Sequence, residues 1–192
     1  MKISAILTLV STSLLAMSAT AHGIYPVVHL GYEFGGDELA TVVRDDGSKG
    51  NLSVNEGLSI GLGLSFPLSE SLELQSSLGY VGKDEEVNRG DASWRSFPWE
   101  SSIIAYLGHF SVGGGVVYHF SPTLDSSGAL SDIGKIEFDD ALGVQAQIAY
   151  SLMHGDMPND LEVGVKHTTI DFVTKETTVV GDSTAVFLKY YF

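Results

Sequence analysis

Apolar residues alternate with polar or small residues along most of this chain after residue 24. Between residues 57 and 66, every even position holds Leu, Ile or Phe, and every odd position holds Gly or Ser. Successive side chains of a β-strand point to opposite faces, so this period of two predicts strands with one apolar face. The C-terminus repeats the pattern, because Val186, Leu188, Tyr190 and Phe192 fall on one face of a final strand.

Eight segments carry this alternation, and turn-rich or polar stretches separate them. They predict strands at about Tyr25–Gly35, Val54–Phe66, Leu72–Gly82, Phe97–Leu107, Phe110–Ser121, Ile136–Leu152, Leu161–Thr174 and Thr184–Phe192. Connections after the second, fourth and sixth segments are short, and the others are mostly longer and more polar. This asymmetry is typical of outer-membrane barrels, so the pattern predicts an all-β fold, an eight-stranded antiparallel up-and-down transmembrane β-barrel.

Alternation alone does not say which face points outward, because a water-soluble barrel with an apolar core shows the same period. Three features favour apolar faces toward lipid: small residues that suit a narrow lumen, aromatic residues near strand ends, and the position of lysines. The aromatic residues include Tyr106 toward the periplasmic rim and Phe138 toward the outer rim. Each Lys in or beside a predicted strand has inward parity: Lys83, Lys135, Lys166 and Lys189. A lysine facing lipid at mid-depth would cost about 2–4 kcal/mol.

The N-terminus has the organisation of a secretory signal peptide. Lys2 provides the positive end, Ile6 to Met17 is mostly apolar, and Ala19-Thr20-Ala21 fits a cleavage site. The apolar stretch is shorter than the roughly 20 residues that a membrane-spanning helix needs. We therefore predict a signal peptide at 1–21, a barrel domain at 22–192 and a location in the bacterial outer membrane.

The chain is acidic, with a formal net charge of −14 at pH 7. This charge argues against nucleic acid as a partner, since phosphate binding needs a basic surface. Cysteine is absent, which excludes disulfides and thiolate metal sites. His167 and Asp171 are four residues apart on a strand, about 13 Å, too far to share one metal ion. No cofactor and no metal site are predicted.

Several charged residues have inward parity on the predicted strands. A buried charge is costly unless it is paired, so these side chains are expected to form a salt-bridged network that fills the narrow lumen. The predicted network consists of His29, Glu33, Glu73, Glu100, Asp139, Glu162, Lys166 and Lys189. The alternative is that the lumen stays open as a narrow ion-conducting pore.

His119 and Ser121 share a face by parity, and with Glu137 they invite comparison with lipid A deacylases, which are also barrels. A serine nucleophile needs a base within hydrogen-bond reach. Their expected inward parity does not suit an enzyme that takes its substrate from the bilayer, and Pro122 follows at once as if the strand were ending. The main expectation is therefore a protein without catalysis, and a lipid A-modifying enzyme is kept as an alternative.

The chain resembles the small eight-stranded outer-membrane β-barrel superfamily that includes the OmpA-like transmembrane domain. The resemblance rests on the terminal Tyr190-Tyr191-Phe192 and on the segments Gly113 to Pro122, Phe138 to Gly143 and Lys166 to Asp171. With the strand pattern, the loop asymmetry and the lack of a convincing triad, we expect a structural or surface-interaction role, a monomer, and lipid and lipopolysaccharide as surroundings. The resemblance implies insertion by the outer-membrane assembly machinery with periplasmic chaperones, for which Tyr190 and Phe192 match the terminal signal. Phe187 departs from that signal, which favours Gly at this place.

Overall fold

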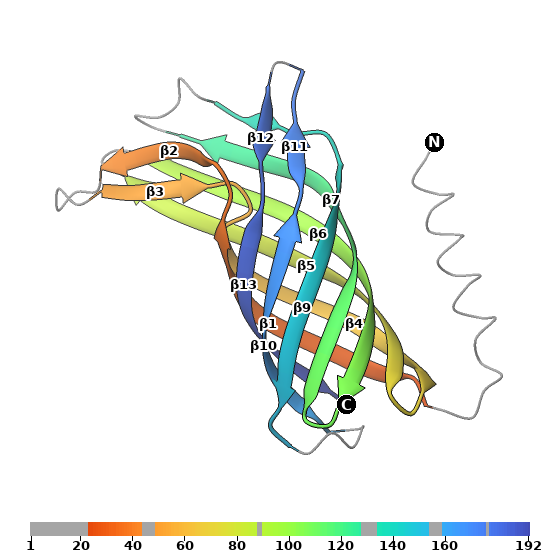
Figure 1. Cartoon of the computed structure of the whole chain (residues 1–192). Helices are drawn as coiled ribbons and strands as arrows, with labels where there is room; N and C mark the ends of the chain where they lie inside the picture. The colour runs from red at the N-terminus through yellow and green to blue at the C-terminus, as the bar shows by residue number, and fades with distance from the viewer. Residues whose placement is uncertain (1–22, 44–48, 88–89, 128–133, 154–158, 176) are drawn as a thin grey trace.

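The computed structural model describes residues 23–43, 49–87, 90–127, 134–153, 159–175 and 177–192. Eight long strands form a closed antiparallel barrel (Figure 1). They are β1 (Tyr25–Gly35), β4 (Gly57–Ser69), β5 (Leu72–Val87), β6 (Gly90–Leu107), β7 (Phe110–Ser126), β9 (Ala141–Ser151), β10 (Leu161–Thr169) and β13 (Ser183–Tyr191). The predicted signal peptide lies outside the described residues. No helix in the described part of the chain is long and apolar enough to cross a membrane.

Each long strand pairs with its sequence neighbours, and the first and last strands close the barrel. Along this closing seam, Val27 lies opposite Tyr191 and Gly35 lies opposite Ser183. The start of β1 and the end of β13 therefore lie at the same end of the barrel, the end with the short connections. The predicted eight-stranded up-and-down topology is confirmed.

The outer connections contain more strand than the sequence pattern predicts. β5 and β6 run beyond the barrel to meet near Val87 and Gly90. Two further hairpins lie at this end, one of β2 (Glu38–Val43) with β3 (Lys49–Ser53), and one of β11 (Asp171–Val173) with β12 (Thr178–Val180). The predicted loops at 36–53, 83–96 and 175–183 are thus partly built as strands.

Two predicted strands are divided in the structure. The segment Ile136–Leu152 contains β8 (Ile136–Glu137), which pairs with the outer end of β7, and β9, which begins only at Ala141. The segment Leu161–Thr174 contains β10 and β11, with β11 paired to β12 instead of to a barrel strand. Both breaks occur where the chain leaves the barrel wall and joins the outer hairpins.

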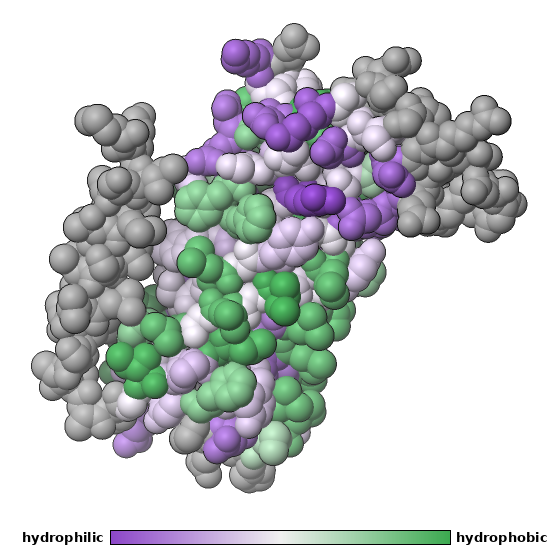
Figure 2. Space-filling view, turned by 180° about the vertical axis from the view of Figure 1, so that it is seen from behind, coloured by the Kyte–Doolittle hydropathy of each residue, from purple (hydrophilic) through white to green (hydrophobic). Residues whose placement is uncertain are grey.

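Apolar side chains cover the outside of the barrel, and charged side chains fill its inside. Leu62 and Leu142 are 66% and 67% exposed, whereas Glu73 and Glu162 are 1% and 0% exposed. Figure 2 shows apolar residues gathered over the barrel wall and polar residues at the end with the outer hairpins. This is the reverse of a water-soluble protein and fits a wall in contact with lipid. The prediction that the apolar faces point outward is confirmed.

Glycines in the barrel wall make room for bulky side chains inside the narrow lumen. A Cβ built on Gly61 would lie 2.2 Å from the His29 ring, and one on Gly164 would lie 2.5 Å from the Phe187 ring. These rings therefore lie directly over glycine backbone. The small residues that alternate with apolar ones in the sequence have this packing role.

Adjacent glycines of β7 offer a matched test of this packing. A Cβ on Gly115 would lie 2.0 Å from the backbone oxygen of Ser101 on the neighbouring strand, whereas on Gly114 its nearest neighbour would be 3.5 Å away. We expect Gly115→Ala to lower the free energy of unfolding by about 1–3 kcal/mol, as overpacking does. Gly114→Ala, on the exposed face, should stay close to wild type. Urea unfolding in lipid vesicles would measure both, and equal effects of the two variants would contradict the packing.

Candidate functional site: the barrel lumen and its outer cap

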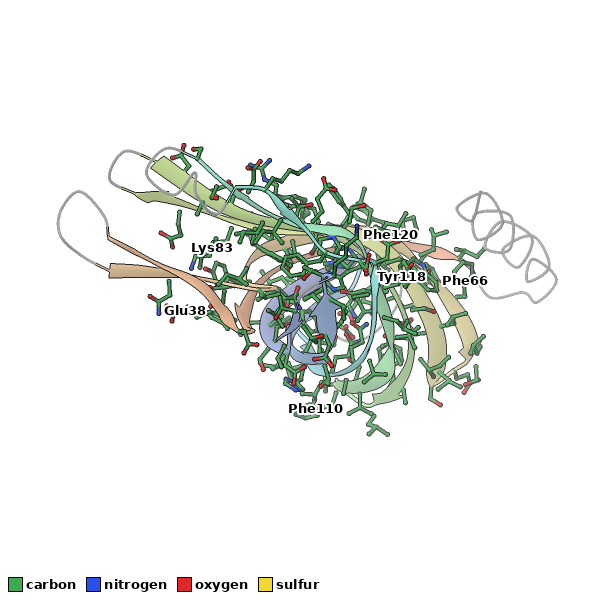
Figure 3. The ribbon with its side chains drawn as sticks, turned by 90° about the horizontal axis from the view of Figure 1, so that it is seen from above. Glu38, Phe66, Lys83, Phe110, Tyr118 and Phe120 are labelled. Atoms are coloured by element: carbon green, nitrogen blue, oxygen red, sulfur yellow. The ribbon has the colours of Figure 1, made fainter. Side chains whose placement is uncertain are left out.

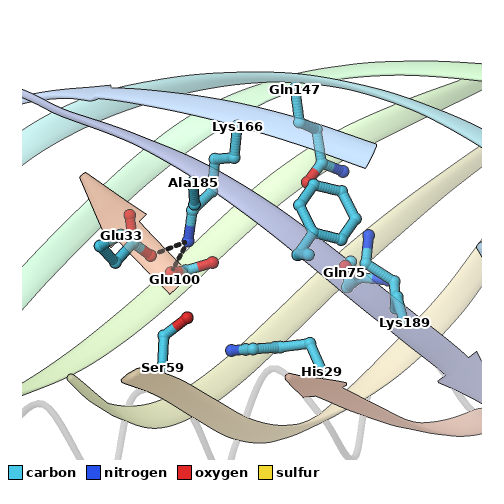
Figure 4. A pocket seen from close by; sticks show the side chains of 10 residues that line it. His29, Glu33, Ser59, Gln75, Glu100, Gln147, Lys166, Ala185 and Lys189 are labelled. Atoms are coloured by element: carbon cyan, nitrogen blue, oxygen red, sulfur yellow. Dashed lines mark hydrogen bonds and ion pairs between the residues drawn. The ribbon is translucent and has the colours of Figure 1, made fainter. Parts of the chain in front are cut away.

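An ion triad crosses the middle of the lumen and joins three strands that are far apart in sequence (Figure 4). Lys166 of β10 places its Nζ 2.6 Å from Glu100 Oε1 on β6 and 3.4 Å from Glu33 Oε1 on β1. Gln145 donates an N–H to Glu100, and the Ser183 hydroxyl donates to Glu33. All three charged side chains are largely buried, so each charge depends on the others for compensation.

A second polar layer lies nearer the periplasmic end. The Tyr191 hydroxyl is 3.2 Å from Glu73 Oε1 and 3.3 Å from Glu162 Oε2. Ser65 donates its hydroxyl to Glu73 at 2.5 Å. Lys189 places its Nζ 3.8 Å from Glu162 Oε2 and 5.1 Å from the centre of the Phe187 ring. This layer fills the lumen with hydrogen-bonded and charged groups.

A small cavity separates the two polar layers. Its volume is about 20 Å³, and its lining includes His29, Ser59, Gln147, Phe187 and Lys189 (Figure 4). A cavity of this size has room for about one water molecule. It does not amount to a continuous aqueous channel.

An apolar cluster, here called the cap, lies inside the barrel end that carries the outer hairpins. Its centre is Trp94, which is fully buried, with ring centroids 5.5 Å from Phe138 and 5.3 Å from Phe172. The remaining members of the cap are Leu52, Val54, Ala92, Val117, Leu124, Ala141 and Ile170. The cap joins residues from the barrel wall to residues from three outer connections.

The alternation along the chain does not predict the cap. The sequence does contain one indication of the cap. Ala92 and Trp94 continue the inward alternation of β6 beyond the predicted start of that strand. The pattern was not recognisable as a cluster, since Phe138 and Phe172 reach it only after breaks in their own strands. Phe138 therefore faces the cap and not the lipid, which corrects its assignment to an outer aromatic rim. Tyr106 also faces inward, where its hydroxyl lies 3.1 Å from that of Tyr191.

The structure places seven of the eight predicted lumen residues inside the barrel. His29, Glu33, Glu100, Lys166 and Lys189 line the cavity, and Glu73 and Glu162 lie in the periplasmic layer. Asp139 is the exception, and its assignment to the lumen was wrong. It is exposed in the break between β8 and β9, where its backbone N–H donates to the Val173 carbonyl. The break shifts the alternation by one position, so Phe138 points inward instead.

His119, Ser121 and Glu137 are not brought together. His119 is buried, with Nδ1 3.0 Å from the Ser96 hydroxyl. Ser121 has a positive φ of 47°, is exposed, and donates its backbone N–H to Asp140. The left-handed backbone at Ser121 reverses the alternation of β7. The expectation that His119 and Ser121 share a face was therefore wrong. Glu137 is exposed and binds Lys135 at 2.6 Å, and this hydrogen bond with its positive charge lowers the pKa of Glu137.

Lys83 of β5 lies beside the β2–β3 hairpin at the outer end (Figure 3) and ties the two hairpins together. Its Nζ lies 2.9 Å from Glu56, 3.2 Å from Glu85 and 2.8 Å from the backbone oxygen of Asn51. Burial by itself lowers the pKa of Lys83, but the hydrogen bonds and charges of Glu56 and Glu85 outweigh burial and raise it. Lys83 thus stays charged and holds β3 against β5.

The C-terminal aromatic residues lie at the periplasmic end. The rings of Tyr190 and Phe192 meet edge to face with centroids 4.8 Å apart, and Phe192 is exposed. The Tyr190 hydroxyl donates to Asn159 at 3.2 Å. Their role as an assembly signal remains a prediction. Among the described residues, no group of three or more His, Cys, Asp or Glu side chains is placed to hold a metal ion.

Comparison with known proteins bears on the fold. No protein-family model and no curated protein matches the chain. Among solved structures, Ail of Yersinia pestis in complex with the heparin analogue sucrose octasulfate has a TM-score of 0.56 at 12% identity, covering 88% of this chain and 96% of Ail. A second Ail structure gives 0.51 at 8% identity, with coverage of 88% and 96%. Neisserial surface protein A gives 0.48 at 13% identity, with coverage of 89% and 98%.

At sequence identity this low, structural similarity shows a shared fold and does not show a shared function or partner. The closed eight-stranded wall, the apolar exterior and the polar lumen are nevertheless properties of this chain itself. Barrels with a lipid-facing wall span bacterial outer membranes. The fold is that of the small outer-membrane β-barrels, as the sequence pattern and the family resemblance both predict, and the protein is an integral barrel of that membrane.

Proposed function

We propose that this protein is a non-catalytic, non-conducting outer-membrane barrel whose outer hairpins act as a surface for interaction. The observation that carries the proposal is the double closure of the lumen. The cap fills the outer end with aromatic and aliphatic side chains, and the ion triad with the periplasmic layer fills the remainder. An ion would have to cross an apolar cluster and displace buried ion pairs to pass through.

The outer hairpins are suited to present a fixed surface. Leu52, Phe138, Ile170 and Phe172 anchor their connections in the cap, and Lys83 joins two of the hairpins. A surface that is already ordered loses less conformational entropy when it binds a partner. The cap therefore supports both parts of the proposal, a closed lumen and a preorganised exterior.

The outer end carries more negative than positive charge. Among the residues whose exposure the structure describes, the exposed acids of this end are Asp37, Glu38, Asp84, Asp91, Asp125, Glu137, Asp139, Asp140 and Asp171, and the exposed bases are Arg95, Lys135 and Lys175. Ail was crystallised with a heparin analogue. Like charges repel, so we propose that the partner of the present protein is neutral or cationic rather than a sulfated polysaccharide. Protein in lipid nanodiscs should pass immobilised heparin unretained at physiological salt, and retention would contradict this choice of partner.

Planar-bilayer recording tests the closed lumen. Purified wild-type protein is expected to give no discrete conductance steps, with a general porin inserted under the same conditions as the positive control. Heat-modifiable gel mobility of the same sample would verify that the barrel is folded. Discrete and reproducible steps from the folded protein would favour the narrow-pore alternative.

Lipid A mass spectrometry tests the absence of catalysis. Cells that express the protein and cells that lack it are expected to have the same lipid A profile. A difference that disappears in Ser121→Ala would restore the enzyme alternative. Because Ser121 is exposed and outside the lumen network, this variant should leave the barrel folded.

A further inference from the structure

Buried acids outnumber buried lysines in the lumen. The acids are Glu33, Glu73, Glu100, Glu162 and, at the periplasmic end, Asp160, and the lysines are Lys166 and Lys189. Asp160 accepts hydrogen bonds from the Ser151 hydroxyl and the Leu161 N–H on one carboxyl oxygen. A carboxylate that is removed from water without a cation is so costly that it tends to take up a proton instead. At least one of these buried acids is therefore expected to be uncharged.

Among the four glutamates, the positions of the lysines single out one acid. Glu33 and Glu100 share Lys166, and Glu162 has Lys189 at 3.8 Å. In the part of the chain that the structure describes, no lysine, arginine or histidine nitrogen is found within 4.0 Å of the Glu73 carboxyl. Glu73 is 1% exposed, so it also lacks water as a substitute.

The hydrogen bonds around Tyr191 lead to the same acid. The Tyr191 hydroxyl lies within hydrogen-bond distance of two carboxyl oxygens, Glu73 Oε1 and Glu162 Oε2. A hydroxyl has a single hydrogen to donate. If both acids were ionised, one of these contacts would bring two oxygens together with no proton between them. A proton on either acid removes this conflict, and the position of Lys189 favours ionised Glu162.

We propose that Glu73 is a proton-binding site in the lumen and is an uncharged carboxylic acid at neutral pH. The Glu73 O–H donates to the Tyr191 oxygen, and the Tyr191 O–H donates to the Glu162 carboxylate. Glu162 in turn is held by Lys189 and by the Ser111 hydroxyl at 3.2 Å. One proton then lies in each of the two contacts that Tyr191 makes with the acids.

The other contacts of Glu73 fit the uncharged form. The Ser65 hydroxyl donates to Oε2, and Gln75 donates an N–H to Oε1 at 3.3 Å. The Tyr106 hydroxyl donates to the Tyr191 oxygen at 3.1 Å. The titratable and charged groups that face Glu73 are thus Tyr106, Glu162, Lys189 and Tyr191, and Lys189 alone among them is a cation. The uncharged acid removes one negative charge from the lumen and completes a continuous hydrogen-bonded chain from Glu73 through Tyr191 to Glu162.

Infrared spectroscopy of the folded protein in lipid nanodiscs tests the assignment. With ¹³C-labelled glutamate, the wild type is expected to show the isotope-shifted carbonyl band of a protonated carboxyl at neutral pH. The band should disappear in Glu73→Gln and persist in the matched variant Glu100→Gln. A wild-type spectrum without the band, or a band that survives in Glu73→Gln, would overturn the proposal.

A stability comparison gives an independent readout. Glu73→Gln exchanges one uncharged group for another and should leave the urea midpoint close to that of wild type. Glu162→Gln takes the anion away from Lys189 and should lower the midpoint. The opposite order would place the proton on Glu162 and refute the assignment. If Glu73→Gln does not fold, the site-assigned carboxyl ¹³C chemical shift of the wild type in solid-state NMR decides between protonated and ionised Glu73.

Discussion

Trp94→Ala is expected to lower the free energy of unfolding by about 3–5 kcal/mol, the range found when a buried aromatic residue is truncated. Trp94 is fully buried and touches both other rings of the cap, so its removal would leave a cavity between three outer connections. Its indole N–H is buried without a hydrogen-bond partner in the described structure. The whole loss should therefore come from packing. Urea unfolding in lipid vesicles, followed by gel mobility, would measure it.

Two variants separate the cap from general effects of the outer end. Trp94→Phe keeps an aromatic ring and loses no hydrogen bond, so it should be clearly milder than Trp94→Ala. Arg95→Ala changes the adjacent exposed residue, whose ion pair with Asp84 is solvated, and should cost no more than about 1 kcal/mol. A Trp94→Ala barrel as stable as Arg95→Ala would show that the cap is not tightly packed.

Lys166→Met is the second variant for which a large loss is expected. It keeps an unbranched side chain but leaves Glu33 and Glu100 buried without their shared cation. Removing one partner of a buried ion pair typically costs about 3–5 kcal/mol, because the remaining charge is uncompensated. The same unfolding measurement at neutral pH would detect this loss.

A rescue experiment distinguishes charge from shape at this site. Glu33→Gln and Glu100→Gln, added to Lys166→Met, remove the stranded charges and should recover most of the lost stability. Lys135→Met is the matched surface control, because the Lys135–Glu137 pair is exposed and should have no measurable effect. A triple variant no more stable than Lys166→Met would mean that the lysine acts by filling space.

The architecture was predictable because it depends on local alternation. Leu58, Ile60 and Leu62 face outward as the period of two requires, and Glu33, Lys166 and Lys189 face inward for the same reason. Once the parity of a strand is known, its apolar face must point to the lipid and its other face into the narrow lumen. The pairing within the lumen was not predictable, since Lys166 meets Glu100 only through the stagger of β10 against β6 across the barrel.

The errors arise where the alternation is interrupted. Asp139 and Ser121 were assigned by counting positions along a strand, and a break or a positive φ shifts that count by one. The cap depends on the meeting of Trp94, Phe138 and Phe172, which are far apart in sequence. Such long-range contacts follow from the path of the outer connections and not from the period of any one strand.

The seam between β1 and β13 has a consequence for biogenesis. Its nine residue pairs, from Val27 with Tyr191 to Gly35 with Ser183, join the first strand to the last. If the predicted signal peptide directs export from the N-terminus, β1 leaves the inner membrane long before β13, its partner in this seam. Until then both margins of the growing sheet carry unsatisfied backbone groups, which can recruit a neighbouring chain into an aggregate. Loss of the last nine residues would leave each copy permanently unclosed, with unpaired edge strands that are prone to aggregation.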